Sequence, residues 1–482
     1  MSLFLAWFLP VVAGTASWLI VNPRRTAGWL SAAFGHGIVF GMLITAAATS
    51  LFARNDTQHA MRSAGSALAI FAALASIVAW RRMRAVPIDS VEPIRAVRTN
   101  RVVSFFLAIA FVSIAWRLWI ALREILLRPT FPWDAWDAWA VKSKAWFMLG
   151  HYVPFVAMKD WIATSGPDSF TGVAWSYPST LGWIQVWFAS AAGGWVEPIV
   201  NLPWFALWIG LLFAHYGQWR ALGLSVTRAR VAIYLFASLP LITVHVALAG
   251  YADLWVAAVF GFAVLAWMRW LRERDRGQLF VFVCCVLLLP LLKLEGAVWL
   301  LLFAIVAVFA ALRRPWRKYV ALACAALLLI GLALGKLILP LLTLGWVHVA
   351  PHTIEVPVLG PLAIAWHSGA FGGTLRTLFE QPNWNLLWWV APVIVVARWR
   401  ELRDQESLRL LACLLVICIA FLMFLFLFTD AARFAESFTA INRLVMHVVP
   451  ALITMLALLL RDAVLPEFPG TAPASDPRSN PA

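Results

Sequence analysis

Charged residues are scarce in this sequence. Only 13% of its 482 residues are Asp, Glu, Lys or Arg, whereas 63% are hydrophobic. A soluble globular domain carries about 25% charged residues, so this composition excludes a soluble protein. The apolar residues are gathered into runs that can cross a bilayer. The composition therefore predicts an all-α polytopic membrane protein with no soluble domain of any size.

Acidic residues are the scarcer of the two charge types. The chain has 23 acidic and 38 basic residues, which gives a formal net charge of +15. In a soluble protein such an excess would indicate nucleic-acid binding. Here the arginines cluster in short loops between apolar runs, which is the pattern that determines membrane topology. We therefore expect the lipid bilayer as a partner and no nucleic acid.

Cysteine is also rare, and its placement excludes two further classes of protein. The five cysteines all lie inside apolar runs, which predicts neither a disulfide framework nor a zinc site. The sequence contains no internal repeat, heptad array or nucleotide-binding glycine motif. The cysteines are expected to be packing residues: Cys284, Cys285, Cys324, Cys413 and Cys418.

The first residues, MSLFLAWFLP, lack the positive region of a cleavable signal peptide. The apolar run continues to Val21, so we expect it to remain as the first span. About thirteen transmembrane helices are predicted from the apolar runs at 2–21, 29–53, 66–80, 102–122, 197–216, 231–250, 252–268, 279–292, 295–312, 319–340, 385–397, 410–428 and 444–460.

The basic loops predict the orientation of these spans. If all of them are cytoplasmic, the N-terminus lies outside, the C-terminus lies inside, and thirteen spans alternate without contradiction. These loops are centred on Arg24/Arg25, 81–101, 220–230, 272–276, 313–318 and 398–403. The tail at 461–482 is rich in Pro, Ser and Ala and is expected to be disordered in the cytoplasm.

One apolar stretch, residues 180–195, does not fit a regular alternation. If it were a span, the orientation of every later span would be reversed and the later basic loops would lie outside the cell. We therefore interpret it as an interfacial or re-entrant helix on the outer face. The outer face then receives two long loops, 123–178 and 341–384, which carry interfacial helices. The domain organisation predicted is N-terminal transmembrane helices at 1–101, a membrane-embedded catalytic module at 102–460, and the tail.

The first outer loop contains the segment RPTFPWDAWDAWAVKSKAWF. It places Asp134 and Asp137 three residues apart, a spacing that puts two carboxylates on one helix face, with Lys142 and Lys144 just beyond. One interpretation is an amphipathic interfacial helix whose charges face water. The other is a functional site, because the few acids and bases of this chain recur at the same membrane level.

Further ionisable residues lie at the outer ends of later spans. They are Asp253 in GYADLW, Lys293 and Glu295 in LLKLEGAVW, and Arg443 in INRLVMHVVP. Placing an ionisable group at the border of the hydrocarbon region costs free energy, so its presence there favours a functional role. Simpler roles remain open: a helix N-cap for Asp253, a local ion pair for Lys293 and Glu295, and a headgroup anchor for Arg443.

The ordered set of these short motifs resembles the GT-C superfamily of polytopic glycosyltransferases, which includes protein mannosyltransferases, aminoarabinose transferases and RgtA/B/C/D-like bacterial enzymes. The resemblance covers roughly residues 100–460. It rests on Asp134 in the first outer loop, the Lys-x-Lys-Ala helix, the Tyr177–Pro178 segment, Asp253, the Lys-x-Glu-Gly break and a late outer Arg before His-x-x-Pro. The chain departs from it in having Asp-Ala and Tyr-Pro-Ser where members often have Asp-Glu and His-Pro-Pro.

The resemblance implies an inverting transfer of a sugar from a polyprenyl-phosphate-linked donor to an envelope glycan, lipid or protein acceptor, outside the bacterial inner (plasma) membrane. Asp134 would be the general base. Arg443 and Lys293, with Lys144, would neutralise the departing phosphate. Asp253 and Glu295 would orient the acceptor or hold those cations. Asp137, Lys142 and Tyr177 complete the expected substrate-binding set.

No cofactor is expected with certainty, although Asp134 together with Asp253 could accept a hard divalent cation. The second outer loop holds His348, His352, Glu355 and His367. A proline between the first two histidines interrupts any helix that would align them on a zinc ion. We interpret this loop as an acceptor-binding or lid loop.

Two other functions fit a basic polytopic protein. A transporter or flippase of lipid-linked saccharides would show inverted repeats or midplane charges, and neither is visible. An O-antigen ligase or polymerase would share the donor and rely on outer-loop Arg and His residues, so the histidines of the second loop keep it open. The identities of the sugar and acceptor do not follow from the sequence.

Overall fold

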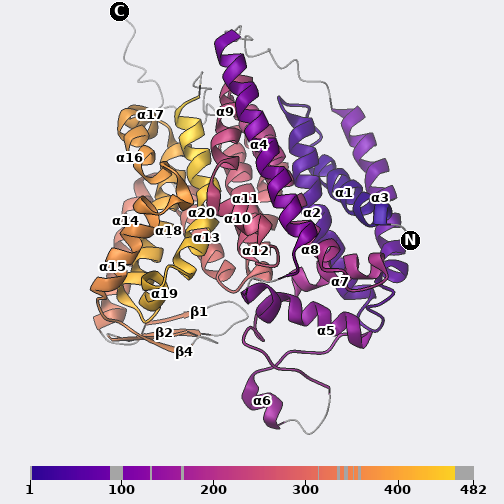
Figure 1. Ribbon diagram of the computed structural model, residues 1–482. Coiled ribbons are helices and arrows are strands. Elements are labelled where there is room, and N and C mark those ends of the chain that lie inside the picture. The colour runs from indigo at the N-terminus through magenta and orange to yellow at the C-terminus, as the bar shows by residue number, and fades with distance from the viewer. Residues whose placement is uncertain are drawn as a thin grey trace, which may run out of the picture.

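The computed structural model describes residues 3–86, 101–130, 133–163, 168–312, 314–333, 337–340, 346–350, 352–356 and 360–461. Within these residues the chain is a bundle of helices with one small sheet at an end (Figure 1). The predicted disordered tail lies outside the described residues from position 462 onward. So does most of the predicted basic loop, at 87–100, and parts of both outer loops.

The first half of the chain contributes long helices and a group of shorter ones at the first outer loop. The long helices are α1 (Leu3–Val21), α2 (Trp29–Phe52), α3 (Ala60–Ala85), α4 (Arg101–Leu127) and α8 (Glu197–Ala221). The shorter ones, between α4 and α8, are the π-helix η1 (Ala135–Ala140), α5 (Val141–Leu149), α6 (Met158–Ala163) and α7 (Thr180–Ala192).

Helices α9 to α14 follow. They are α9 (Val226–Ala237), α10 (Pro240–Ala247), α11 (Asp253–Glu273), α12 (Arg276–Leu292), α13 (Gly296–Ala311) and α14 (Arg314–Ala333). The axis bends by 61° between α9 and α10. Pro240 opens α10, and because proline has no N–H and clashes with the preceding turn, the helix cannot run through it.

The last part of the chain begins with a four-stranded antiparallel sheet in the order β1 (Leu337–Pro340), β2 (Trp346–Ala350), β3 (Thr353–Val356) and β4 (Gly360–Ala363). The remaining elements are α15 (Ser368–Leu375), η3 (Arg376–Glu380), η4 (Pro382–Trp384), α16 (Leu387–Ala397), α17 (Trp399–Asp404), α18 (Glu406–Phe428), α19 (Ala432–Glu436) and α20 (Ala440–Leu459).

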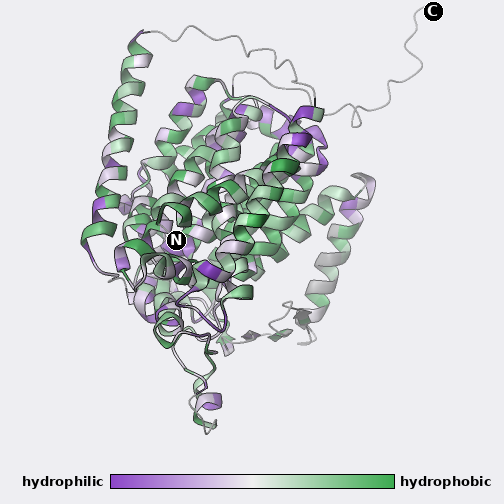
Figure 2. Ribbon diagram, turned by 90° about the vertical axis from the view of Figure 1, so that its right-hand side faces the viewer, coloured by the Kyte–Doolittle hydropathy of each residue, from purple (hydrophilic) through white to green (hydrophobic). Residues whose placement is uncertain are grey.

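Eight of the described helices are long and apolar enough to cross a membrane, and the bent α9–α10 pair makes a ninth if it counts as one span. The outer surface of the bundle is apolar as well: Phe105, Val112 and Trp116 of α4 are all more than 60% exposed. Such a surface suits lipid and not water, and hydrophilic residues lie mainly toward the helix ends (Figure 2). The chain is a polytopic α-helical membrane protein.

The predicted count of thirteen spans is not established. Each apolar run overlaps a helix, or the two helices α9 and α10 in the case of 231–250, but α12, α13 and α16 have only 17, 16 and 11 residues. A run of that length suits a buried helix as well as a span. The prediction for 319–340 is wrong at its end, because α14 ends at Ala333 and Leu337–Pro340 is strand β1. The chain is predominantly helical, as expected, and the exception lies between 337 and 363, where four strands pair by backbone hydrogen bonds.

The basic loops that the structure describes gather at one end of the bundle. Arg24 lies 3.7 Å from Asp275, Arg272 donates to the Leu222 carbonyl, and Arg228 donates to the Leu460 carbonyl. In Figure 1 this end carries α17, while α5, α6 and the sheet lie at the other. We call the end with α5 and the sheet the outer end, following the predicted orientation.

Helix α7, which falls in the ambiguous stretch 180–195, does not cross the bundle. Thr180 at its start donates to the Leu291 carbonyl at the outer end of α12. Ser190 near its other end donates to the Gln58 carbonyl, beside the contact between Thr57 and the loop after α5. Both ends of α7 therefore lie at the outer end, in agreement with the prediction that this stretch is no span.

The centre of the bundle is formed by α11 and α20. In each, about nine-tenths of the most apolar 18-residue window is buried, at 89% and 94%, against 17% for α4. Both helices begin at the outer end. Their first residues therefore place polar side chains at the meeting point of a dry core and the outer loops, where the candidate residues Asp253 and Arg443 lie.

Candidate functional site

The first outer loop approaches α11 at an unusually close backbone contact. Gly250 adopts φ +113° in the turn before α11, and a Cβ built there would lie 2.6 Å from the Cβ of Ala135. Only glycine allows this conformation and this approach. The contact holds the start of η1 against the turn that leads into Asp253.

Asp134 immediately precedes η1, and its carboxylate Oδ2 accepts a hydrogen bond from Nη1 of Arg443 in the first turn of α20. The Asp134 side chain stays 35% exposed, and the Arg443 side chain 23%. The Arg443 guanidinium also lies over the Tyr251 ring, 5.1 Å from its centroid. The fold thus joins the predicted acid of the first loop to the predicted cation of the last span.

Asp137 does not join this contact. The argument that Asp134 and Asp137 share a helix face assumed α-helical geometry, but residues 135–140 form a π-helix, whose wider turn changes which residues align. Asp137 is half-buried, and no ion pair among the described residues includes it. The shared face was therefore a wrong prediction.

A second group of charged residues lies deeper in the bundle than the Asp134–Arg443 pair, among buried side chains. The Lys293 amine is 2.8 Å from Asp253 Oδ1 and 3.0 Å from Glu295 Oε1. Asp253 is fully buried and Lys293 is 4% exposed. Lys293 has extended backbone between the end of α12 and the start of α13, which directs its side chain toward the start of α11. The helix break of the Lys-x-Glu-Gly motif therefore builds a carboxylate–ammonium–carboxylate arrangement.

His447 adds a fourth member, one helical turn after Arg443 on α20. Its Nδ1 accepts a hydrogen bond of 3.0 Å from Trp299 Nε1, and its Nε2 lies 3.0 Å from Asp253 Oδ1. Indole nitrogen is only a donor, so Nδ1 must carry the lone pair and Nε2 the proton. Trp299 thereby fixes the tautomer in which His447 donates to Asp253. His447 is the histidine of the His-x-x-Pro motif, for which the sequence predicted no chemical role, and Trp299 was not predicted to belong to the site.

Three buried atoms of this cluster have no hydrogen-bond partner among the described residues. They are Asp253 Oδ2, Glu295 Oε2 and Arg443 Nε. A buried polar group without a partner costs about 1–3 kcal/mol, and more when it is charged. The described residues thus leave two acceptors and one donor unsatisfied, and Arg443, which carries the donor, also pairs with Asp134.

Lys142 and Tyr177 connect the loop to this cluster. Lys142 donates to the carbonyls of Trp175 (3.1 Å) and Tyr177 (2.8 Å), and burial lowers the pKa of Lys142 from 10.5 to about 8. Tyr177 packs on the Trp139 ring and donates to Glu295 at 3.4 Å. Burial, and then the Glu295 charge, raise the pKa of Tyr177. Lys142 therefore positions the loop that presents Tyr177.

Lys144 points to the opposite side of the same helix. Residues two apart on a helix lie on nearly opposite faces, and Lys144 pairs with Glu197 of α8 at 3.7 Å instead of with the cluster. Of the nine residues predicted for the site, seven thus lie in or directly against the cluster, while Asp137 and Lys144 do not contact it through any described ion pair or hydrogen bond.

The divalent-cation site suggested for Asp134 and Asp253 stays a prediction. Asp253 Oδ1 is occupied by Lys293 and His447, and Asp134 pairs with Arg443. No group of three or more His, Cys, Asp or Glu residues with metal-binding geometry occurs in the described part of the chain. The histidines of the second outer loop lie on or near the sheet, where His348 is paired in register with Glu355.

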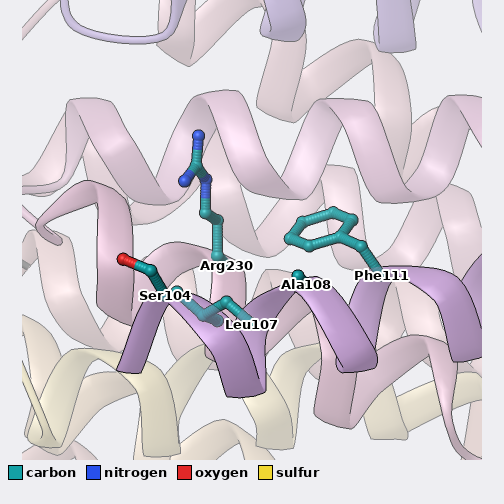
Figure 3. A pocket seen from close by; sticks show the side chains of 5 residues that line it. All are labelled: Ser104, Leu107, Ala108, Phe111 and Arg230. Atoms are coloured by element: carbon teal, nitrogen blue, oxygen red, sulfur yellow. The ribbon is translucent and has the colours of Figure 1, made fainter. Parts of the chain in front are cut away.

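A cavity of about 370 Å³ lies at the other end of the bundle, between α4 and α9. In Figure 3, Arg230 rises between Ser104 on one side and Phe111 on the other. Arg230 is the single ionisable residue among those that line this cavity, and no acid accompanies it. This cavity therefore lacks the acid–base chemistry of the outer cluster.

No family model, curated protein or solved structure matches the chain. The geometry of the outer cluster is therefore the guide to function.

Proposed function

We propose that this chain is an integral membrane glycosyltransferase that transfers a sugar from a polyprenyl-phosphate donor to an acceptor hydroxyl. The observation that carries the proposal is the set of unsatisfied buried groups on Asp253, Glu295 and Arg443, beside the accessible carboxylate of Asp134. Two acceptors suit the hydroxyls of a sugar, and the guanidinium donor suits a phosphate oxygen.

Asp134 is the general base in this proposal. It takes the proton of the acceptor hydroxyl while the acceptor oxygen bonds to the anomeric carbon of the donor sugar. The bond between that carbon and the phosphate oxygen breaks, and its electron pair leaves with the polyprenyl phosphate. This single displacement inverts the configuration at the anomeric carbon. The exposure of Asp134 at the outer end supports the role, because the acceptor must reach it.

Arg443 connects the base to the leaving group. Its Nη1 donates to Asp134, while its Nε is buried without a partner and can donate to a phosphate oxygen. A planar guanidinium can make both contacts at once, which a lysine ammonium cannot do in the same geometry. The start of α20 adds the favourable end of a helix dipole for the charge that develops on the phosphate.

The remaining residues hold these groups in place. Lys293 lies between two carboxylates, so we assign it to orienting Asp253 and Glu295 and not to direct contact with the phosphate. His447, with its tautomer fixed by Trp299, orients Asp253 from the other side. Glu295 and Asp253 keep one free oxygen each for sugar hydroxyls. Lys142 and Tyr177 close the site from the first loop.

The same proposal includes three further statements. The chain belongs to the GT-C superfamily and lies in the inner (plasma) membrane. Its N-terminus is outside and its C-terminus is cytoplasmic. The shared end of the basic loops supports the orientation, because the positive-inside rule puts that end in the cytoplasm. The candidate cluster then opens to the extracytoplasmic side, where a lipid-linked donor presents its sugar.

The test is a transfer assay on the protein in proteoliposomes. A panel of short-chain polyprenyl-phosphate monosaccharides is supplied with an envelope extract as acceptor, and release of polyprenyl phosphate is measured by chromatography. We expect release with at least one donor, and its loss in Asp134→Asn. Movement of the intact donor across the bilayer, without release by any panel member, would overturn the proposal in favour of a flippase.

A further inference from the structure

A second cavity, of about 320 Å³, lies on the face of η1 and α5 that points away from Arg443. Its walls come from η1 and α5, from the end of the α4 segment at Thr130, and from the turn that leads into α8. The side chains that matter for its chemistry are Trp136, Lys144, Met148, Trp195 and Glu197. None of them takes part in the Asp134–Arg443 pair or in the buried Asp253 network.

The charges of Lys144 and Glu197 cancel each other, but both side chains can still form further hydrogen bonds. Lys144 and Glu197 lie 3.7 Å apart, longer than a hydrogen bond, and the Lys144 side chain is 51% exposed. Both groups therefore keep donor and acceptor capacity for a ligand. Because the pair is neutral overall, the cavity favours a neutral polar ligand over an anion.

Glu197 is held in a fixed position by the end of the α4 segment. Its Oε2 accepts a hydrogen bond of 2.7 Å from the backbone N–H of Thr130. Thr130 in turn accepts a hydrogen bond of 2.6 Å from Asn201 of α8 through its hydroxyl. A carboxylate anchored in this way is preorganised, so it loses little side-chain entropy when it binds a ligand.

Tryptophan side chains lie in this cavity and next to Asp134, the proposed base. Trp136 and Trp195 both line the cavity, and Trp136 packs against Trp133 with ring centroids 5.7 Å apart. Trp133 is 70% exposed and is the residue directly before Asp134. We call these three residues the tryptophan strip: Trp133 and Trp136 are in ring contact, and Trp195 lines the same cavity as Trp136. Exposed indole faces pack well against the C–H faces of a sugar ring while water wets the sugar hydroxyls.

We propose that this cavity and the tryptophan strip bind a carbohydrate chain. Sugar rings stack on Trp136 and Trp195, and the hydroxyls of the bound sugar bond to Glu197 and Lys144. That the chain is the acceptor, whose terminal hydroxyl reaches Asp134 along Trp133, rests on the proposed function. A zwitterionic phospholipid headgroup fits the charge pair as well, but it leaves the strip toward Asp134 without a role.

The experiment measures binding and not transfer. The full-length protein in nanodiscs is mixed with soluble oligosaccharides, namely maltotriose, chitotriose and mannotriose, and contact is detected by saturation-transfer NMR of the sugar protons. We expect a signal from at least one trisaccharide, reduced about tenfold in Trp136→Ala and in Glu197→Gln. Trp119→Ala, which removes an exposed indole from the lipid-facing side of α4, is the matched control.

The outcomes separate this inference from the proposed function. Binding by a wild-type protein that releases no polyprenyl phosphate in the transfer assay supports the carbohydrate site and counts against the transferase. Binding that persists in Asp134→Asn while transfer is lost supports both. Absence of a signal from every trisaccharide overturns the carbohydrate site, whatever the transfer assay shows. Loss of a copurified phosphatidylethanolamine from Lys144→Met, seen by native mass spectrometry without any sugar signal, would identify a lipid site instead.

Discussion

Arg443 in the last long helix donates a hydrogen bond to the carboxylate of Asp134 in the first outer loop, across a sequence separation of 309 residues. Four residues after Arg443 on the same helix, His447 contacts Asp253. One face of α20 therefore holds both the exposed acid and the buried one. This relationship makes Arg443 and Asp134 the residues whose substitution tests the site most directly.

Asp134→Asn should abolish transfer while the protein folds normally. The amide keeps the shape of the side chain and can still accept from Arg443, but it cannot take a proton. Loss of a positioned base costs about 10²–10⁴-fold in rate. The measurement is turnover of the polyprenyl-phosphate donor, with fluorescence-detected size exclusion as the check on folding.

Asp137→Asn is the matched control, because it removes a nearby carboxylate that pairs with no cation in the described residues. It should retain most of the activity. Equal residual activity in the two variants, or wild-type turnover in Asp134→Asn, would refute the assignment of the base.

Arg443→Ala should lose both donor affinity and turnover, and Arg443→Lys should recover only part of each. An ammonium group can pair with Asp134 or with the phosphate, but it lacks the planar fork that reaches both. Donor binding to the purified protein and its turnover are measured separately. If Arg443→Lys matches the wild type in both, Arg443 is a headgroup anchor, which lysine replaces equally well.

The sequence predicted the helices well wherever an apolar run was uninterrupted. The run 252–268 became α11 (Asp253–Glu273), and 102–122 became α4 (Arg101–Leu127). Composition could not decide whether short apolar helices such as α12 and α13 cross the membrane, because buried helices and spans are both apolar. Pro240 was the available sign that the run 231–250 breaks into two helices. Nothing in the local pattern predicted the π-helical turn after Asp134.

The candidate site was predictable in part because ionisable residues are conspicuous in an apolar chain. Asp253, Lys293 and Glu295 stood out for that reason, and the structure brings them within hydrogen-bonding distance of one another or of a shared partner. His447 stood out only as the first residue of the His-x-x-Pro motif, with no chemical role, and Trp299 did not stand out at all, because tryptophan is unremarkable in apolar runs. Their role arises only from the packing of α13 against α20, which the sequence does not reveal.

His447→Gln should retain more activity than His447→Phe. A glutamine amide can donate to Asp253 and accept from Trp299, whereas phenylalanine leaves both without this partner. A hydrogen bond to a buried charged group contributes about 1.5–3 kcal/mol. Turnover and thermal unfolding are compared for both variants. Equal loss of activity in the two would show that the imidazole itself is required.

Lys142 should make the free energy of unfolding depend on pH. Burial lowers its pKa to about 8 in the folded protein, from the 10.5 expected when it is exposed. Between these values the unfolded chain binds more protons, so the contribution of Lys142 to stability increases as the pH rises from about 8 to 10. The neutral amine keeps two N–H groups, enough for the carbonyls of Trp175 and Tyr177.

The measurement is the difference in free energy of unfolding between the wild type and Lys142→Met at several pH values. This difference should shift in favour of the wild type with rising pH, by an amount on the order of 1–3 kcal/mol. Lys159→Met, which removes an exposed lysine of the same outer loop, is the control. A difference that stays constant or falls with pH contradicts the prediction.

Lys293→Met should destabilise the fold more than any loss of a surface cation. Asp253 would be left buried without its 2.8 Å partner, and Glu295 would lose a partner at 3.0 Å. Breaking a buried ion pair from one side costs about 3–5 kcal/mol. Arg376→Met is the control, because Arg376 and Glu380 are both more than 60% exposed and 3.9 Å apart, a pair that contributes less than about 1 kcal/mol. Unfolding is followed by titration with dodecyl sulfate in mixed micelles.

A second substitution separates the buried charge from the packing of the Lys293 side chain. If the uncompensated carboxylate is the cause, adding Asp253→Leu to Lys293→Met should restore part of the stability, because the buried charge is removed together with its partner. If the cause is lost packing alone, the double variant should be at least as unstable as Lys293→Met. Because Asp253 also anchors His447, the double variant should remain inactive even where its stability recovers. A double variant that recovered turnover would show that Asp253 and Lys293 act only in folding.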